Sequence, residues 1–412
     1  MNNTLIVLGN GFDLFRGMKT KYMDYLDKKL LDAKYDKNWR KAEEELKKFV
    51  DLFDKDISGN VIQLNKIFDK WDNAGLNFWD LLILVHKFFE QEYPAHSWYD
   101  VETMIYEEIL RAPKYDQTML HQKNSFVDTY HVSGHEWDSV NGFIQSYLLI
   151  RQIHDIDEVF DYERPLDIQE RANIEIDVLQ MFSDELKKFE NSFSDYLISI
   201  GQPEYTDEIE RGLRKLFAIQ HTDDEDAHVH NNNVNVLTFN YTKLPNDIAN
   251  NVVNKIRFVH GALGENIDES NIIFGVDNAN IDSNDFEKYK FTKAFRIFTN
   301  PRLNNSTDVY ADVLAEKPDT VKFFGHSLSA ADRTYLYQIF DRIELTNYNS
   351  AFNLVFYVRP YDQKNIDQVK NEAYNQVAKL LNEYAQARME KELSKDLLSS
   401  LVLRDKIHIE EL

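Results

Sequence analysis

Glycines and polar residues follow an apolar run near the start of the chain. Leu5 to Leu8 read as a short buried strand, and Gly9-Asn10-Gly11 comes directly after it. Apolar residues then recur at helical spacing from Leu14, which predicts a strand, a tight turn and a helix. Glycines in such a turn let the backbone approach a ligand, and free amides at the helix start favour a phosphate. Because Leu14 replaces the last glycine of G-x-G-x-x-G, a turn that binds nothing fits this pattern equally well.

Polar residues also follow three later segments that read as buried strands. They are Asn240 and Tyr241 after the segment 235–239, His260 after 255–259, and Gly325, His326 and Ser327 after 321–324, with Asp332 a little farther on. Ligands of an open parallel sheet bind beyond the carboxyl ends of its strands. We therefore expect these residues to share one edge of a sheet with the first glycine turn.

The elements that would position these residues fall into two groups. The stretch 21–220 is helical almost throughout, with an amphipathic helix at Asn38–Val50 and one or two long helices at Arg164–Ile200. After a charged linker at 221–233, β-rich runs alternate with helical stretches, which predicts a parallel sheet that also includes the first strand. The predicted strands are Asn235–Phe239, Lys255–Val259, Asn271–Phe274, Val321–Phe324, Asn353–Val358 and an edge strand at Lys406–Ile409, and the predicted helices here are Asp332–Ile343 and Gln363–Val402.

Composition excludes several classes of function. The chain of 412 residues has no cysteine, so disulfides, cysteine-ligated zinc and thiol catalysis are excluded. A formal charge of −23 opposes binding to nucleic acid or to an anionic membrane. No window is as long as a membrane-spanning helix, and we expect a cytoplasmic protein. The histidines of the polar stretches 112–138 and 221–233 lie in expected loops, so we assign no metal site.

Several short motifs, spread over most of the chain, resemble the phage abortive-infection AbiH family. They are Gly9–Leu14, Trp98–Glu102, Phe239–Thr242, His260-Gly261 and Phe324–Leu328. More distantly, Thr238–Tyr241, His260-Gly261 and Gly325–Leu328 are similar to motifs of sirtuin-like domains in bacterial defence proteins, in the same order.

The resemblance implies an α/β fold with a Rossmann-like, sirtuin-like parallel sheet and a large all-helical insertion. Residues 1–20 and 232–412 would form the nucleotide-binding domain. Residues 21–231 would form the insertion, which would serve as a lid, a sensor or an oligomerisation element. It also implies an abortive-infection effector that binds NAD and hydrolyses it to nicotinamide and ADP-ribose. The sequence leaves open a phage-derived trigger and a homo-oligomer.

The resemblance also implies a role for each matching residue. Asn240 would hold the nicotinamide ribose and the attacking water, and His260 would be the general base. Asp13 would stabilise the positive charge that develops on the ribose. The remaining residues would contact the cofactor, with the first three around the pyrophosphate and Ser327 and Asp332 on the adenosine side: Gly9, Asn10, Gly11, Phe12, Tyr241, Gly325, His326, Ser327 and Asp332.

Other interpretations of these residues remain open. Without cysteine the chain cannot build the usual zinc module of a sirtuin deacylase, which favours water as the nucleophile. A nucleotide sensor without activity, or a nuclease or phosphotransferase acting on nucleotides, are the alternative functions. At the level of single residues, Asp13 could cap a helix, Asn240 could only open a turn, and His260 could be structural. Asp100 and Glu102 could belong to the pocket or to a cap.

Overall fold

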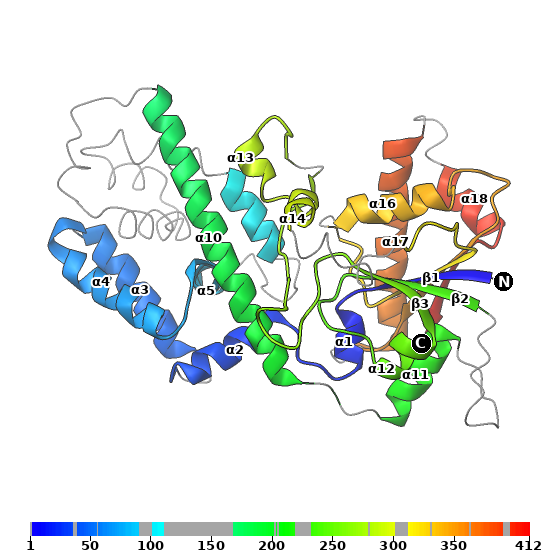
Figure 1. The fold of residues 1–412 in the computed structure, drawn as a ribbon, viewed down its shortest axis with the longest axis horizontal. Coiled ribbons are helices and arrows are strands. Elements are labelled where there is room, and N and C mark those ends of the chain that lie inside the picture. The colour runs from blue at the N-terminus through cyan, green and yellow to red at the C-terminus, as the bar shows by residue number, and fades with distance from the viewer. Residues whose placement is uncertain are drawn as a thin grey trace.

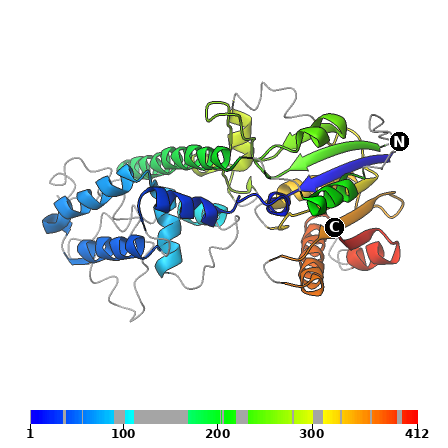
Figure 2. The same ribbon diagram turned by 90° about the horizontal axis from the view of Figure 1, so that it is seen from below.

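A parallel sheet at one end of the molecule adjoins a helical part at the other (Figures 1 and 2). The computed structural model describes residues 2–35, 39–55, 57–89, 101–110, 168–201, 203, 206–218, 232–278, 281–300, 312–329, 332–361, 364–389 and 396–412. The predicted loop 112–138, the motif residues Trp98 to Asp100 and most of the predicted linker 221–233 lie outside these ranges.

Six strands form one sheet in which every pair is parallel. They are β1 (Asn2–Leu8), β2 (Asn232–Thr238), β3 (Val253–Phe258), β4 (Thr320–Phe324), β5 (Asn353–Val358) and β6 (Ile407–Glu411). Their order is β3-β2-β1-β4-β5-β6, and Val7 of β1 pairs with Leu237 and with Phe323. The direction of the strand order therefore reverses between β1 and β4. This confirms the predicted α/β class with a Rossmann-like sheet and a helical insertion.

Alternate residues of the central strand face two separate cores. Leu5 and Val7 pack with α16 (Arg333–Arg342), α17 (Ile366–Arg388) and α18 (Leu397–Leu403). Ile6 and Leu8 pack with α1 (Gly11–Phe15), α11 (Asp207–Phe217) and α12 (Asn246–Asn251) on the other face. Because helices cover both faces of β1, its segment Leu5–Leu8 is apolar throughout.

The helical part has a separate core rich in aromatic side chains. Its helices are α2 (Tyr22–Asp32), α3 (Arg40–Lys55), α4 (Ile57–Asn73), α5 (Phe78–Phe89), the helix 101–110 and α10 (Ile168–Ile200). The predicted amphipathic and long helices are confirmed as α3 and α10, whereas the predicted C-terminal helix is divided into α17 and α18. Phe189 and Phe193 of α10 pack against Tyr22 of α2.

The prediction of a strand at Asn271–Phe274 is wrong. The Asn271 amide donates to the carbonyl of Ala262, and the Ile273 amide donates to that of His260, but no strand pairs with the segment. Ile272 and Phe274 are buried in the core of the helical part. Their β-rich composition therefore reflects burial and not pairing. Two short helices follow, α13 (Phe286–Tyr289) and α14 (Lys293–Thr299).

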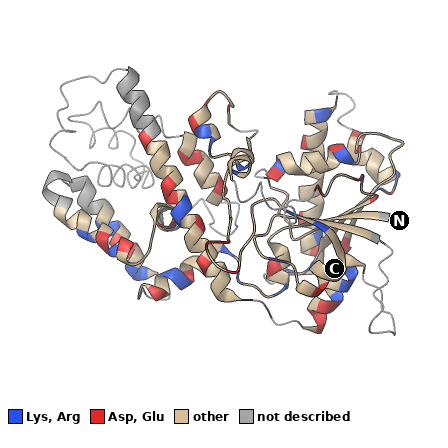
Figure 3. Ribbon diagram, in the orientation of Figure 1, with Lys and Arg blue, Asp and Glu red and all other residues tan. Residues whose placement is uncertain are grey.

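Charged residues of both signs are interspersed along the helices. Figure 3 shows Lys and Arg beside Asp and Glu on α3, whereas acidic residues predominate along the described part of α10. Among the described residues, no helix combines the length and the apolar character needed to cross a membrane.

Candidate active site

The glycines of the first turn bring the ends of β1 and β4 into backbone contact. The Gly9 amide donates to the Phe324 carbonyl at 3.0 Å, and the Gly11 amide donates to the Gly325 carbonyl at 2.8 Å. A Cβ on Gly9 would lie 2.5 Å from the His326 Cα atom. The absence of side chains here is therefore explained by contact between the two turns. The amides of Gly11 and Phe12 are already bonded within the protein, the latter to the Gly9 carbonyl at 2.9 Å.

A cleft of about 680 Å³ opens at the carboxyl ends of β1, β4 and β5. It lies where the strand order reverses, which is the usual ligand position in an open parallel sheet, and its volume is in the range of small-molecule sites. The predicted residues that line it are Gly9, Asn10, Gly11, Gly325, His326, Ser327 and Asp332. Residues that the sequence analysis missed also line it, among them Leu14, Phe15, Lys21, Tyr357, Arg359, Tyr361, Glu372 and Gln376.

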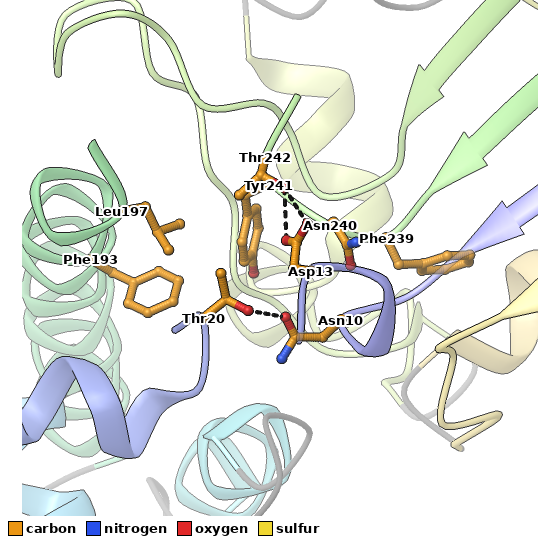
Figure 4. A pocket seen from close by; sticks show the side chains of 9 residues that line it. All are labelled: Asn10, Asp13, Thr20, Phe193, Leu197, Phe239, Asn240, Tyr241 and Thr242. Atoms are coloured by element: carbon orange, nitrogen blue, oxygen red, sulfur yellow. Dashed lines mark hydrogen bonds between the residues drawn. The ribbon is translucent and has the colours of Figure 1, made fainter. Parts of the chain in front are cut away.

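A second, much smaller cavity shares Asn10 and Phe239 with the cleft. It measures about 10 Å³, which is close to the space that one water molecule needs. Figure 4 shows Asn10, Asp13 and Asn240 around it, with Phe193 and Leu197 of α10 on the left. The Asn240 side chain is buried, and neither polar atom of its amide has a partner among the described residues. Since an unsatisfied buried amide is costly, this side chain is suited to hold a bound group.

Asp13 projects from α1 into this small cavity. The Thr242 hydroxyl lies 2.7 Å from each oxygen of its carboxylate (Figure 4), and the Arg16 guanidinium lies 3.4 Å away. Burial raises the pKa of Asp13 to about 6, and the Thr242 hydrogen bond and Arg16 oppose the rise. The N-cap of α1 is Asn10, so the interpretation of Asp13 as a cap is wrong.

Asp332, at the N-cap of α16, is the centre of a buried polar cluster. Its Oδ1 atom lies 2.6 Å from Lys293 Nζ and 3.0 Å from His260 Nε2, and its Oδ2 atom lies 3.5 Å from His326 Nε2. Burial would raise the pKa of Asp332, but Lys293 and His260 hold it well below its usual range. The Asp332 carboxylate is therefore ionised. It lines the cleft and also contacts the buried side chains of Lys293 and His260.

His260 is completely buried and lines neither the cleft nor the small cavity. Burial, together with the positive charge of Lys293, lowers its pKa to about 4. The imidazole is therefore neutral near pH 7, and it faces Asp332 with one nitrogen. The structure thus brings His260 close to the predicted site without exposing it to the cleft.

Glu102 is neither a cap nor a lining residue of the cavities. Its Oε2 atom lies 2.8 Å from Lys293 Nζ, and both side chains are buried. Burial raises the pKa of Glu102 to about 7, although Lys293 opposes the rise. Burial alone would lower the pKa of Lys293, but Asp332 and Glu102 raise it above its ordinary value. Asp100, the other undecided residue, lies outside the described residues.

Within the described part of the chain, no three His, Asp or Glu side chains are grouped so that they could hold a metal ion. The polar groups of the site are instead the amide of Asn240, the carboxylates of Asp13 and Asp332, and the cations Lys21 and Arg359 at the cleft.

Comparison with known proteins adds one finding to this geometry. No curated protein and no solved structure matches the chain. A family model described as bacteriophage abortive infection AbiH matches residues 5–354, from β1 to the beginning of β5. The matched range includes Asp13, Asn240, His260 and Asp332, but not α17 on the far side of the cleft. Because the match covers most of the chain, this protein belongs to the bacteriophage abortive infection AbiH family.

Proposed function

We propose that this AbiH family protein is an anti-phage effector that binds NAD in the cleft and hydrolyses the bond between nicotinamide and ribose. Family membership supports the role in abortive infection. The nucleotide is supported by the position of the cleft, at the reversal of strand order in a parallel sheet. Hydrolysis is supported by the water-sized cavity beside the cleft, where Asn240 and Asp13 lie among apolar side chains.

The extent of the site fits a molecule with two nucleoside ends. Residues that line the two cavities follow β2, β1, β4 and β5, which are neighbours in the sheet. Four adjacent strands span three intervals of about 4.8 Å, or roughly 14 Å along the sheet edge. In our proposal the nicotinamide ribose lies at the β2 end beside Asn240. The adenosine then lies towards Ser327 and Tyr361.

Side-chain cations are the groups best suited to contact the diphosphate. Lys21 and Arg359 line the cleft, and the Arg359 guanidinium lies 4.7 Å from the centre of the Phe15 ring. The turn amides of Gly11 and Phe12 are bonded within the protein, so they do not offer free donors. We therefore assign diphosphate binding to Lys21 and Arg359, and the glycines serve to bring the two turns together.

The proposed reaction breaks the C–N bond, and its electron pair leaves with nicotinamide. A water molecule in the small cavity forms the new C–O bond to the ribose, held by the Asn240 amide. Asp13 takes the proton of this water and later passes it to solvent. Its pKa of about 6 suits proton removal near neutral pH. His260, assigned as the base from the sequence, acts in this scheme through Asp332, because it lines neither cavity.

The observation that carries this proposal is the buried amide of Asn240, which has no partner among the described residues. The test is to incubate the protein with NAD and to separate nicotinamide from NAD by chromatography. We expect Asn240→Ala to lower the rate by about 10²- to 10³-fold, as for loss of a transition-state donor. Asn235→Ala is the matched control, because Asn235 is a buried asparagine within β2 that donates to the Val313 carbonyl and lines neither cavity. Equal rates for wild type and Asn240→Ala would refute the assignment.

One observation favours a second candidate function, a nucleotide sensor without turnover. The polar cluster connects Asp332 at the cleft to Glu102 in the helical part, so occupancy of the cleft can be transmitted there. A sensor would show a higher melting temperature with NAD, by mass action, and would release no nicotinamide.

A further inference from the structure

A lysine buried between two carboxylates joins the helical part to the wall of the cleft. Lys293 at the start of α14 is 1% exposed, and its Nζ atom lies 2.8 Å from Glu102 and 2.6 Å from Asp332. Glu102 comes from the helix 101–110, the cyan helix beside α14 in Figure 1, and Asp332 begins α16. Three separate elements therefore meet at one ammonium group.

Stability alone does not explain this arrangement. Removing an ammonium group and two carboxylates from water costs several kcal/mol per ion, so a buried ion pair is weak support for a fold. A second buried carboxylate already joins α14 to the helical part. Glu190 of α10 pairs with Arg296 of α14 at 2.6 Å and accepts the Phe274 amide at 2.9 Å. Lys293 differs from Arg296 because it contacts a residue that lines the cleft.

The contact with Lys293 determines how Asp332 faces the cleft. Lys293 and His260 share the Oδ1 atom, which leaves Oδ2 directed at His326 Nε2, 3.5 Å away. His326 Nδ1 accepts the Leu328 amide at 2.9 Å, so in the neutral ring the proton is on Nε2, the nitrogen nearer to Asp332. The backbone thus fixes one nitrogen of this cleft-lining ring, and the other nitrogen lies beside the carboxylate that Lys293 holds.

We infer that Lys293 is a positioning residue that couples the helical part, through Glu102, to Asp332 and His326 in the wall of the cleft. A displacement of the helix 101–110 moves Glu102, and Lys293 transmits the change to Asp332. The effect on turnover rests on the proposed function. The effect on the buried side chains does not, and it can be measured without a nucleotide.

The first test compares Lys293→Met with Arg296→Met, the matched control from the same helix. We expect Lys293→Met to lower kcat for nicotinamide release on the order of 10²-fold with little change in KM, as for a misplaced wall of a site. Arg296→Met should keep the wild-type kcat. In NMR titrations of the free protein, Lys293→Met should raise the pKa of His260, since the lysine charge lowers it. Unchanged kcat and unchanged His260 titration in Lys293→Met would overturn the inference.

The second test uses Glu102→Gln, which keeps the shape of the side chain and should destabilise the fold less than Lys293→Met does. The charged and titratable groups that face Glu102 are Lys293, Asp332, Tyr22 and Tyr241. In the wild type, ionisation of Glu102 near pH 7 should appear as an inflection in the His260 ring resonance, well above the pKa of His260 itself. The inflection should be absent in Glu102→Gln. Its persistence in that variant would overturn the coupling.

The two proposals can fail separately. A wild type that neither binds NAD nor releases nicotinamide would refute the proposed function, while the histidine titrations would still decide whether Lys293 couples Glu102 to the cleft wall.

Discussion

Asp13 combines burial with hydrogen bonding in a way that keeps its proton exchangeable near neutral pH. Burial disfavours the carboxylate, and the Thr242 hydroxyl and Arg16 partly restore it. The resulting pKa of Asp13 is about 6. Asp13 lines the same small cavity as Asn240, whose amide we assign to hold the attacking water. A lone buried carboxylate would stay protonated, and a well-paired one would be a weak base.

Asp13→Asn should therefore lower nicotinamide release by about 10²- to 10⁴-fold, because the amide cannot take a proton from water. The wild-type rate should fall about tenfold per pH unit below pH 6 and level off above it, since Asp13 must be ionised to act. The measurement is the pH profile of kcat for both proteins, with circular dichroism to verify the fold of the variant. A variant with the wild-type rate would exclude Asp13 as the base.

His260 should make the protein less stable as the pH falls. The pKa of its imidazole is about 4 in the folded chain and 6.5 when exposed, so the unfolded chain binds more protons between these values. The free energy of unfolding should therefore drop by about 3 kcal/mol as the pH falls through this window. Asp13, whose pKa is raised, acts in the opposite sense between 3.8 and about 6.

The contribution of His260 is isolated by comparing wild type with His260→Gln in urea unfolding at about pH 7.5 and about pH 5. The difference in stability between the two proteins should shrink or reverse at the lower pH. A difference that does not depend on pH would show that folding leaves the pKa of His260 unshifted.

At the residue scale, the sequence predicts which residues at strand ends line the cleft, but it does not predict which buried side chains contact them. Gly9, Gly325 and Ser327 follow predicted strands and do line the cleft. Lys293 carries no such signal, because a lysine at the start of a short helix is ordinarily exposed. Arg359 could have been found, since it follows the predicted strand Asn353–Val358 by the same rule that found the others.

At the scale of elements, the decisive contact joins the turn after β1 to the turn after β4. Gly325 has φ +70°, and a Cβ there would lie 2.3 Å from the Phe12 nitrogen. Neither turn can move away without breaking the bonds between Gly9, Gly11 and the β4 turn. The part of the cleft wall formed by these two turns is thus held together by backbone hydrogen bonds.

Gly325→Ala should destabilise the protein by more than the roughly 1–3 kcal/mol of a strained backbone, because Phe12 leaves no room for a methyl group. Gly17→Ala is the control, since Gly17 also has a positive φ, +80°, but no atom lies within 4 Å of its Cβ position. The difference in free energy of unfolding between the two variants measures the contact alone. Equal losses would mean that the two turns can separate at no cost.

Helices and strands were predictable from the sequence where a buried apolar segment also forms the hydrogen bonds that its composition favours. Strand β5 and the long helix α10 follow directly from their apolar patterns. The segment Asn271–Phe274 has the composition of a strand, but its side chains are buried by helices, and a sequence does not say which surface covers it. The same limit applies to α11, which lies in the predicted insertion yet packs its apolar side on the sheet.

At the scale of the whole molecule, Phe274 joins the segment beyond β3 to the helical part. Its ring centre lies 5.2–5.7 Å from those of four other aromatic residues: Tyr22, Phe189, Phe193 and Tyr241. Tyr241 directly follows Asn240, so this aromatic cluster also supports the loop that holds the proposed water site.

Phe274→Ala should lower the free energy of unfolding by about 3–5 kcal/mol, as expected for a large cavity in a packed core. We also expect weaker NAD binding, because Asn240 loses the support of the neighbouring Tyr241. Urea unfolding and calorimetric titration measure the two effects. Phe286→Ala is the control, since that ring is 54% exposed and should change both quantities little. If the Phe274→Ala variant is destabilised but its NAD affinity is unchanged, the aromatic cluster does not support the loop that carries Asn240.

The pairing of β1 has a consequence for synthesis of the protein on the ribosome. Thr4 of this central strand pairs with Val234 on one side and with Thr320 on the other. A nascent chain therefore carries an unpaired β1 while the helices of residues 22–200 emerge and begin to fold. The walls contributed by β4, β5 and α17 come last, so a polypeptide that ends before them has no cleft. Any harm that the cleft does to the host cell can begin only when translation is nearly complete.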